Sequence, residues 1–358
     1  MAVSRIGILT GGGDCPGLNA VIRAVVKRAK VELGWEVIGI PDGFAGLMED
    51  RPLLPLGLDE VSGILPKGGT ILGTSNRADP YRDAEGRDRS AEVAEKIRAL
   101  GLDALITVGG DGTQTISQRL FAEQGVATYG VPKTIDNDVA ATDYTFGFDS
   151  ARVVATDAVD RLHSTAESHD RVMVLEVMGR DAGFIAAHSG LAGGADAILI
   201  PEIPFDLERV AAKLAARRER GRRFSVVVVA EGARPRDGSQ SFLEGAEARP
   251  GRNVGRLGGV GASVAHELEA LTGMEARVTV LGHLQRGGSP TPFDRVLGSA
   301  FGCQVLSEVA AERPGRMVAL RGNDVVSVPL TEAIGRPRRV APDGQLVRCA
   351  QGLGIVFG

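Results

Sequence analysis

The chain has 358 residues, of which 43% are hydrophobic and 24% are charged, and its formal net charge is −4. This length and composition exclude a fibrous or disordered protein and predict either one large globular domain or two medium ones, and we expect two. The negative charge argues against nucleic acid or an anionic membrane as the main partner, and it leaves small anionic substrates open.

The cysteines and the N-terminal residues indicate a compartment. Cys15, Cys303 and Cys349 lie far apart and fit neither a disulfide framework nor a zinc site. The N-terminal residues run directly into an apolar segment and a glycine turn without a signal region, and no apolar run approaches membrane-spanning length. We therefore expect a cytoplasmic protein.

Apolar runs that end in glycines alternate with amphipathic segments along the chain, which predicts strands and helices in turn. Strands are expected, in chain order, at residues 5–10, 36–40, 105–108, 171–177, 197–200, 225–230 and 277–281. Helices are expected at residues 18–32, 90–100, 150–168, 207–220 and 293–312, directly after Gly183, and at an opening in the glycine-rich segment 255–261.

This alternation predicts an α/β protein made of two Rossmann-like lobes, with mostly parallel sheets covered by helices and the active site in the cleft between the lobes. We expect the larger lobe to contain residues 1–147 and about 285–330. The smaller lobe is expected to contain residues 148–284 and about 331–358.

The first candidate site is the glycine turn Gly109-Gly110-Asp111-Gly112-Thr113. A strand that ends in glycines before a helix presents backbone N–H groups to phosphate. The acidic Asp111 cannot itself bind phosphate, so we expect it to hold a cation such as Mg²⁺ against phosphate oxygens. The alternative is a tight turn without chemistry. The sequence contains neither the GxxxxGK[ST] phosphate loop nor the protein-kinase signatures.

A pair of carboxylates follows the next apolar run, in Thr134-Ile135-Asp136-Asn137-Asp138. In an extended segment Asp136 and Asp138 would face the same way and each would raise the pKa of the other. One of them can then serve as the base that activates a hydroxyl. The alternative is that the Asn-Asp pair only makes a turn.

Cationic residues at strand edges form a further candidate set with a carboxylate. As a set, Arg171, Arg277, Arg286 and His283 can bind a phosphate monoester, although each alone is more typical of a surface charge. Glu231 directly follows a buried apolar run, where it can accept hydrogen bonds from sugar hydroxyls or play a purely structural role.

Eight segments, taken in order, resemble the phosphofructokinase family over residues 6–295. They are GGGDCPGLNAVIR, GGTILGTS, GGDGT, PKTIDND, FGFDSA, VMGRDAG, AEG and TVLGHLQRGGSPTPFDR. The resemblance implies phosphoryl transfer to the 1-hydroxyl of fructose 6-phosphate, which gives fructose 1,6-bisphosphate in glycolysis. It also implies a cytoplasmic homodimer or homotetramer whose sugar-phosphate sites are shared between subunits.

The resemblance further implies roles for single residues. On the donor side, Gly12 and residues 110–113 contact the donor phosphates, Asp111 holds Mg²⁺, and Asp136 takes the proton of the sugar hydroxyl with Thr134 and Asp138 beside it. On the sugar side, the implied residues are Met178, Gly179, Arg180, Glu231, Arg277, His283 and Arg286. Met178, Gly179 and Arg180 line the sugar and the transition state, and Glu231 binds sugar hydroxyls. Arg171 and Arg277 reach in from a neighbouring subunit. The larger lobe then binds nucleotide and Mg²⁺, and the smaller lobe binds the sugar phosphate.

Two departures from the family pattern concern the phosphoryl donor. Gly112 resembles the ATP users of the family, because a side chain there would occupy space that the α-phosphate needs, whereas Lys133 is typical of pyrophosphate users. We give Gly112 more weight and predict ATP, since a flexible lysine need not block it. Asn76 stands where an arginine is typical, and Arg77 follows it as a possible substitute.

The alternative functions differ from the predicted one in the phosphoryl donor or in the class of protein. The first is the diphosphate-dependent fructose 6-phosphate 1-phosphotransferase, and a more distant one is an NAD or diacylglycerol kinase that shares the GGDGT turn. A sugar-phosphate sensor without catalysis is disfavoured, because binding alone needs no base. Arg23, Lys27 and Arg152 are candidates for an effector or interface site, with exposed helix charges as the alternative.

Overall fold

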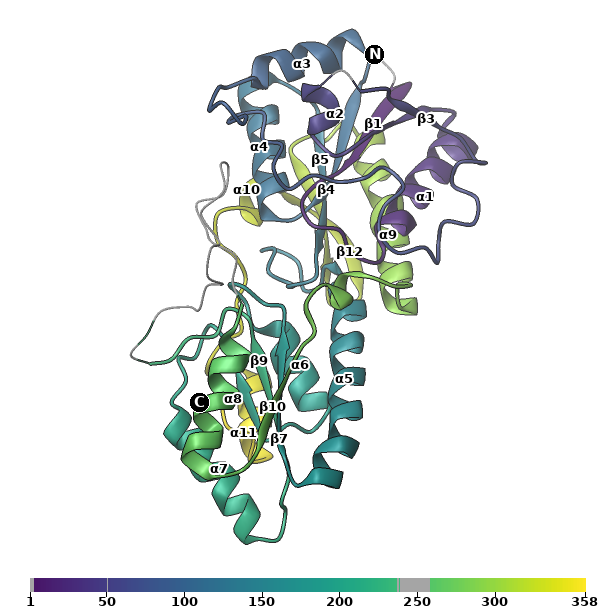
Figure 1. The fold of residues 1–358 in the computed structure, drawn as a ribbon. Coiled ribbons are helices and arrows are strands. Elements are labelled where there is room, and N and C mark those ends of the chain that lie inside the picture. The colour runs from purple at the N-terminus through teal and green to yellow at the C-terminus, as the bar shows by residue number, and fades with distance from the viewer. Residues whose placement is uncertain (1–2, 50, 237, 239–257) are drawn as a thin grey trace. The chain divides into compact units, whose positions relative to one another are not determined.

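The computed structural model describes residues 3–49, 51–236, 238 and 258–358 (Figure 1). The chain divides into two compact units, a first unit of Met1–Ser150 and Arg286–Pro337 and a second unit of Ala151–Gln285 and Arg338–Gly358. Among the described residues, no helix combines the length and the apolar character that a membrane crossing requires.

The first unit is built on an eight-stranded mixed sheet in the order β12-β11-β5-β4-β1-β2-β3, with β6 pairing β5. Its strands are β1 (Arg5–Thr10), β2 (Glu36–Ile40), β3 (Leu54–Leu56), β4 (Ala104–Gly109), β5 (Thr128–Thr134), β6 (Phe146–Gly147), β11 (Arg316–Arg321) and β12 (Asp324–Pro329). The central strands are parallel, and only β3 and β12 run antiparallel to their neighbours. All six residues of β4 are buried, as expected of a strand covered on both faces.

Helices cover this sheet (Figure 1). They are α1 (Leu18–Arg28), α2 (Ala45–Met48), α3 (Ser90–Ala99), α4 (Asp111–Gln124), α9 (Pro292–Ala310) and α10 (Leu330–Ala333). Helices α1 and α9 pack closely because Gly302 faces α1, where an added Cβ would lie 2.8 Å from the Cβ of Ala24. The helix expected to reach residue 32 ends at Arg28 and continues as a π-helical turn to Leu33.

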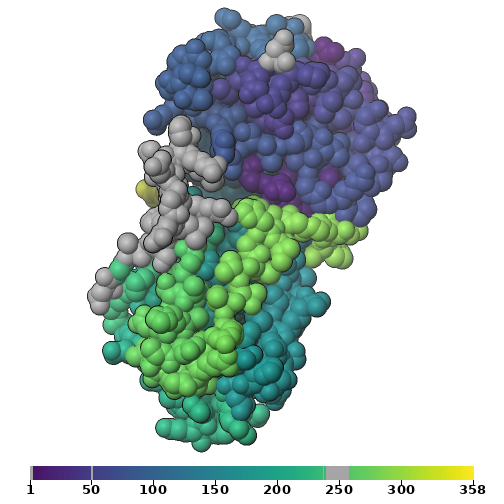
Figure 2. Space-filling model, viewed as in Figure 1, coloured from purple at the N-terminus to yellow at the C-terminus, as the bar shows by residue number. Residues whose placement is uncertain are grey.

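The second unit has a four-stranded, fully parallel sheet in the order β10-β7-β9-β8. Its strands are β7 (Val172–Val177), β8 (Ala197–Leu199), β9 (Ser225–Ala230) and β10 (Ala276–Val280). Its helices are α5 (Phe148–His169, which begins in the first unit), α6 (Phe184–Ala192), α7 (Leu207–Glu219), α8 (Val260–Thr272) and α11 (Gln345–Gly352). The edge strand β10 exposes most of its side chains, and the green residues of α8 and β10 lie on the surface shown in Figure 2.

The predicted fold class is confirmed, because both sheets are helix-covered and mostly parallel. The prediction missed strands β3, β6, β11 and β12 and the short helices α2, α10 and α11. Of these, β3, β6 and the three helices are too brief to show a clear period. The glycine-rich segment 255–261 lies partly outside the described residues, and α8 begins at Val260. The cleft between two lobes stays a prediction.

Candidate functional site

Three neighbouring parallel strands of the first unit, β1, β4 and β5, end at the same edge of the sheet, and the loops that follow them meet there. The β1 loop contacts the segment that carries Asn76, because Gly11 forms a β-bridge with Ser75. The β4 loop lies against the end of β5, where an added Cβ on Gly110 would lie 3.4 Å from the carbonyl oxygen of Lys133. The structure therefore brings together the donor-side residues that the sequence predicted.

The glycine triplet after β1 separates into residues with different backbone roles. The N–H of Gly12 donates to the carbonyl of Ser75 at 2.9 Å, and its carbonyl accepts from the Thr74 hydroxyl at 2.6 Å. Both backbone polar groups of Gly12 are therefore hydrogen-bonded within the protein. The N–H of Gly13 has no hydrogen-bond partner among the described residues. Gly13, to which the sequence reasoning gave no role, is the residue whose N–H can meet a phosphate.

Lys133 is buried, with only 4% of its surface exposed, and its ammonium group donates to the carbonyl of Gly13. Burial lowers the pKa of Lys133, and the neighbouring Arg286 lowers it further, against the opposing charges of Asp14 and Asp138. The β1 loop therefore holds Lys133 through the carbonyl of Gly13.

The turn after β4 places Asp111 as the first residue of α4, with Gly110 as its N-cap. One carboxylate oxygen of Asp111 accepts from the N–H of Gly335 at 3.2 Å, and no hydrogen bond from the described residues reaches the other. A Cβ added to Gly112 would meet no heavy atom within 4 Å, so the space beside the helix N-terminus is open. The N–H groups of this first turn suit an anion.

The side chain of Thr113 packs inside the turn that follows β4. It is 7% exposed, and its hydroxyl would lie within 2.6 Å of a Cβ added to either Gly11 or Gly109. Its side chain therefore fills the space that these two glycines leave, and only its backbone N–H remains for a donor phosphate.

The TIDND segment turns where an extended backbone was expected. Strand β5 ends at Thr134, and Asn137 adopts a left-handed conformation with φ 54°. The Asn137 side chain fixes the turn by accepting from the N–H of Thr145 at 3.0 Å. The expectation that Asp136 and Asp138 face the same way in an extended segment is therefore wrong, because a left-handed residue separates them. The hydroxyl of Thr134 accepts from the N–H of Asp136 at 3.1 Å.

Arg286 reaches the same loop from the far end of the sequence. Its guanidinium donates to the carbonyl of Asp14 at 3.0 Å and would lie 2.8 Å from a Cβ on Gly13.

Asn76 and Arg77 follow Ser75 on the surface, and both are exposed. Cys15 is fully buried beneath the loop, and burial raises the pKa of its thiol to about 12, so this thiol stays protonated.

The second unit gathers another set at the carboxyl ends of β7 and β9. Met178, Gly179 and Arg180 follow β7, and Glu231 follows β9. The two loops are in contact, since the N–H of Gly232 donates to the carbonyl of Gly179 at 3.1 Å. His283, exposed, follows β10 at the same edge, and Gln285 accepts from the N–H of Met178 at 3.4 Å.

Arg171 and Arg277 lie at the opposite end of this sheet. Arg171 directly precedes β7, so six strand residues, or roughly 20 Å, separate it from Met178. Arg277 is the second residue of β10, and three strand residues, or roughly 13 Å, separate it from the loop after that strand. Both arginines contact Glu275, and the Arg171 to Glu275 pair spans 2.8 Å. Within one chain, the structure does not bring these arginines to Met178, Glu231 or His283.

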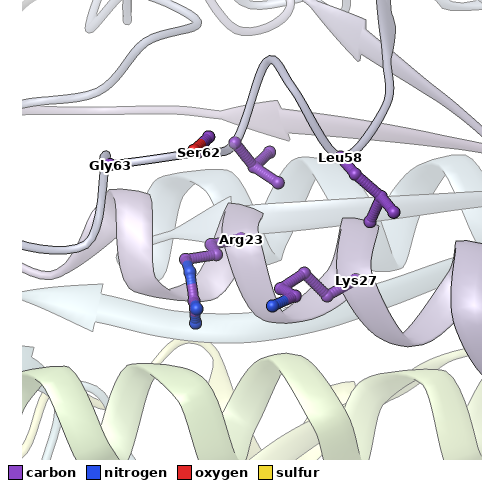
Figure 3. A pocket seen from close by; sticks show the side chains of 6 residues that line it. Arg23, Lys27, Leu58, Ser62 and Gly63 are labelled. Atoms are coloured by element: carbon purple, nitrogen blue, oxygen red, sulfur yellow. The ribbon is translucent and has the colours of Figure 1, made fainter.

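A pocket of about 190 Å³ in the first unit is lined by none of the loop residues described above. It is lined by Arg23, Lys27, Leu58, Val61, Ser62 and Gly63. Figure 3 shows Arg23 and Lys27 on one helix, α1, across from the loop that carries the other four residues. Two of the three cationic effector candidates thus share a pocket, whereas Arg152 belongs to the second unit.

Comparison with known proteins decides the family. Residues 5–309 match the family described as phosphofructokinase. The chain is 57% identical over 358 residues to the ATP-dependent 6-phosphofructokinase of Chloroflexus aggregans, with 99% of this chain and 98% of that one covered.

The chain belongs to the phosphofructokinase family.

Family members named for different donors are similar to it. A pyrophosphate–fructose 6-phosphate 1-phosphotransferase of Streptomyces coelicolor is 51% identical over 354 residues, which cover 99% of this chain and all of that one (100%). Pichia pastoris phosphofructokinase has a TM-score of 0.80 at 32% identity, over 93% of this chain and 38% of that one. A pyrophosphate-dependent phosphofructokinase structure from Marinobacter aquaeolei, at 22% identity, shares the fold with a TM-score of 0.80 over 99% of this chain and 93% of that one.

Proposed function

We propose that this member of the phosphofructokinase family transfers a phosphoryl group from ATP to the 1-hydroxyl of fructose 6-phosphate, giving fructose 1,6-bisphosphate and ADP. The observation that carries the proposal is the meeting of the β1, β4 and β5 loops, with Asp111 at the start of α4 and open space beside Gly112. Full-length identity of 57% to a relative named as ATP-dependent supports this donor.

Diphosphate is the second candidate donor, and Lys133 is the observation that favours it. The lysine is buried beside the phosphate-facing loop, and a relative named for pyrophosphate is 51% identical. ATP is the better supported donor because the ammonium group of Lys133 is already bonded to Gly13, whereas the space at Gly112 is open to an additional phosphate.

The residues present fit a Mg²⁺ ion. Mg²⁺ is usually held by one or two carboxylates together with substrate phosphates, and it keeps several waters. Asp111 offers one carboxylate, which the Gly335 N–H orients, and the described residues contain no cluster of three acidic, histidine or cysteine ligands that would form a complete cage. When bound there, the ion would neutralise charge on the phosphates.

The protein's own groups supply the rest of the chemistry. The Gly13 N–H and the first turn of α4 orient the donor phosphates, and Asp136 accepts the proton of the sugar 1-hydroxyl as it attacks. Thr134 fixes the backbone at Asp136 through the 3.1 Å hydrogen bond. In this proposal the first unit binds nucleotide and metal, and the second unit binds the sugar through Glu231 and its neighbours. The reaction takes place in the cytoplasm.

The position of Arg171 and Arg277 supports a homo-oligomer with shared sugar-phosphate sites. Because they lie at the far end of the sheet from the loops of their own chain, we assign them to the 6-phosphate site of a neighbouring copy. Co-expression of Arg277→Ala and Asp136→Asn chains tests this assignment. Mixed oligomers should recover activity that both parents lack at low fructose 6-phosphate, and no recovery would refute a shared site.

A donor comparison tests the function itself. Purified protein is given fructose 6-phosphate and Mg²⁺ with either ATP or pyrophosphate, and fructose 1,6-bisphosphate is measured. We expect product with ATP and a loss of roughly 10²- to 10⁴-fold in kcat for Asp136→Asn. Product with pyrophosphate but not with ATP would show that Lys133, and not Gly112, determines the donor.

A further inference from the structure

Gln114, in the first turn of α4, lies beneath the site with no exposed surface (0%). Its side-chain NH₂ group donates to the carbonyl of Gly109 on β4 at 2.9 Å and to the carbonyl of Val131 on β5 at 3.0 Å. It also lies 3.4 Å from the carbonyl of Thr107. One carboxamide thus links the last residue of β4 to the middle of β5.

The backbone of Gln114 holds the same loop. Its N–H donates to the carbonyl of Gly110 at 3.0 Å, which closes the first turn of α4 directly after the strand. Gln114 binds the carbonyls of Gly109 and Gly110, and Asp111 is the next residue of the chain. Asp136 lies five positions after Val131, whose carbonyl Gln114 also binds. Gln114 therefore contacts the supports of both carboxylates without contacting either carboxylate.

A glutamine at this position lowers the stability of the folded protein, because one of its polar groups is buried without a partner in the described part of the chain. The side-chain oxygen of Gln114 has no hydrogen-bond partner among the described residues. A Cβ added to Gly130 would lie 2.2 Å from this oxygen. A buried polar group without a partner is unfavourable, and an apolar side chain of similar size would fill the space without this cost.

We infer that Gln114 is a positioning residue, which fixes the β4 loop that carries Asp111 relative to the β5 loop that carries Asp136. The inference rests on the proposed function, because it takes its importance from these two carboxylates. Misplacing a reacting group by about 1 Å can cost roughly 10²-fold in rate, so a tie between the two loops acts on catalysis and not on folding alone.

Ser117 offers a matched control on the same helix. It is likewise 0% exposed, and its hydroxyl bonds to that of Thr107 at 2.9 Å, so it also links α4 to β4. It lies one turn further from the loops. Loss of its hydroxyl removes a buried hydrogen bond without loosening Gly109 or Val131.

The test compares Gln114→Met, which keeps the length but removes the donor, with Ser117→Ala. We expect Gln114→Met to lower kcat by roughly 10- to 100-fold with KM for fructose 6-phosphate within about twofold of wild type. Ser117→Ala should keep kcat within about twofold of wild type, even if its midpoint of thermal unfolding falls as much as that of Gln114→Met. Wild-type kcat in Gln114→Met, or equal losses in both variants, would overturn the inference.

Gln114→Glu keeps the test decisive if the methionine variant does not fold. A protonated carboxyl can donate one hydrogen bond to a strand carbonyl, whereas a carboxylate donates none. Its kcat relative to wild type should therefore fall as pH rises, and a pH-independent ratio would count against the role of Gln114 as a donor.

Asp111→Asn and Asp136→Asn are measured alongside. If both keep wild-type kcat, the proposed function fails; if both lose it while Gln114→Met does not, only this inference fails.

Discussion

Replacing Gly112 by aspartate tests how the protein selects ATP. Gly112 lies in the first turn of α4, and a Cβ there would meet nothing within 4 Å. The new side chain therefore fits the folded protein without a clash, and a carboxylate in the first turn of a helix is itself mildly favourable for stability. Any loss of activity must then come from what the side chain does to the donor.

The expected magnitude follows from electrostatics. A carboxylate at about 4 Å from one phosphate charge, at an effective dielectric constant of about 20, is repelled by about 4 kcal/mol. This energy corresponds to roughly a 10³-fold loss in kcat/KM for ATP. Pyrophosphate lacks the α-phosphate, so it should lose far less.

The assay is steady-state formation of fructose 1,6-bisphosphate with each donor, for the wild type, Gly112→Asp and Gly112→Ala. The alanine variant adds volume without charge and separates the two effects. An aspartate variant that uses ATP as well as wild type, with an unchanged midpoint of thermal unfolding, would refute the placement of the donor beside Gly112.

Two further predictions concern the loops and the core. A Cβ at Gly232 would lie 1.9 Å from the carbonyl oxygen of Arg180, so Gly232→Ala should separate the two sugar-side loops by about 1.5 Å and lower kcat/KM by at least roughly 10²-fold. Gly352→Ala, where a Cβ meets nothing within 4 Å, is the control and should keep wild-type kcat/KM; equal values in both would contradict the prediction. Burial raises the pKa of Asp294 from 3.8 to about 6. The unfolded chain then releases its proton first, so stability should fall by about 3 kcal/mol between about pH 4 and pH 6 and stay level above it. In urea unfolding, Asp294→Asn should lack this component, and identical pH slopes for the two proteins would contradict it.

Local sequence was enough to predict the chemistry of the donor side. Glycines at the ends of buried apolar runs indicate loops at one edge of a parallel sheet, and adjacent parallel strands bring such loops together. Asp111 was found in this way, and the structure places its loop against the end of β5. Lys133, which lies in β5, was found only through the resemblance to the family. The sequence failed where backbone conformation is set by one residue, as at Asn137, whose left-handed turn separates Asp136 from Asp138.

The sequence by itself determined the fold class, the family and the residue types of the site, because periodicity and short motifs are local properties of the chain. Tertiary structure alone decided which N–H of the glycine triplet has no hydrogen-bond partner among the described residues. It also decided what holds Lys133 and which strand carbonyls Gln114 binds. It also placed Arg171 and Arg277 at the far end of their own sheet. Each of these depends on hydrogen-bond partners or strand neighbours distant in sequence, and their pairing is fixed only when the strands pack side by side.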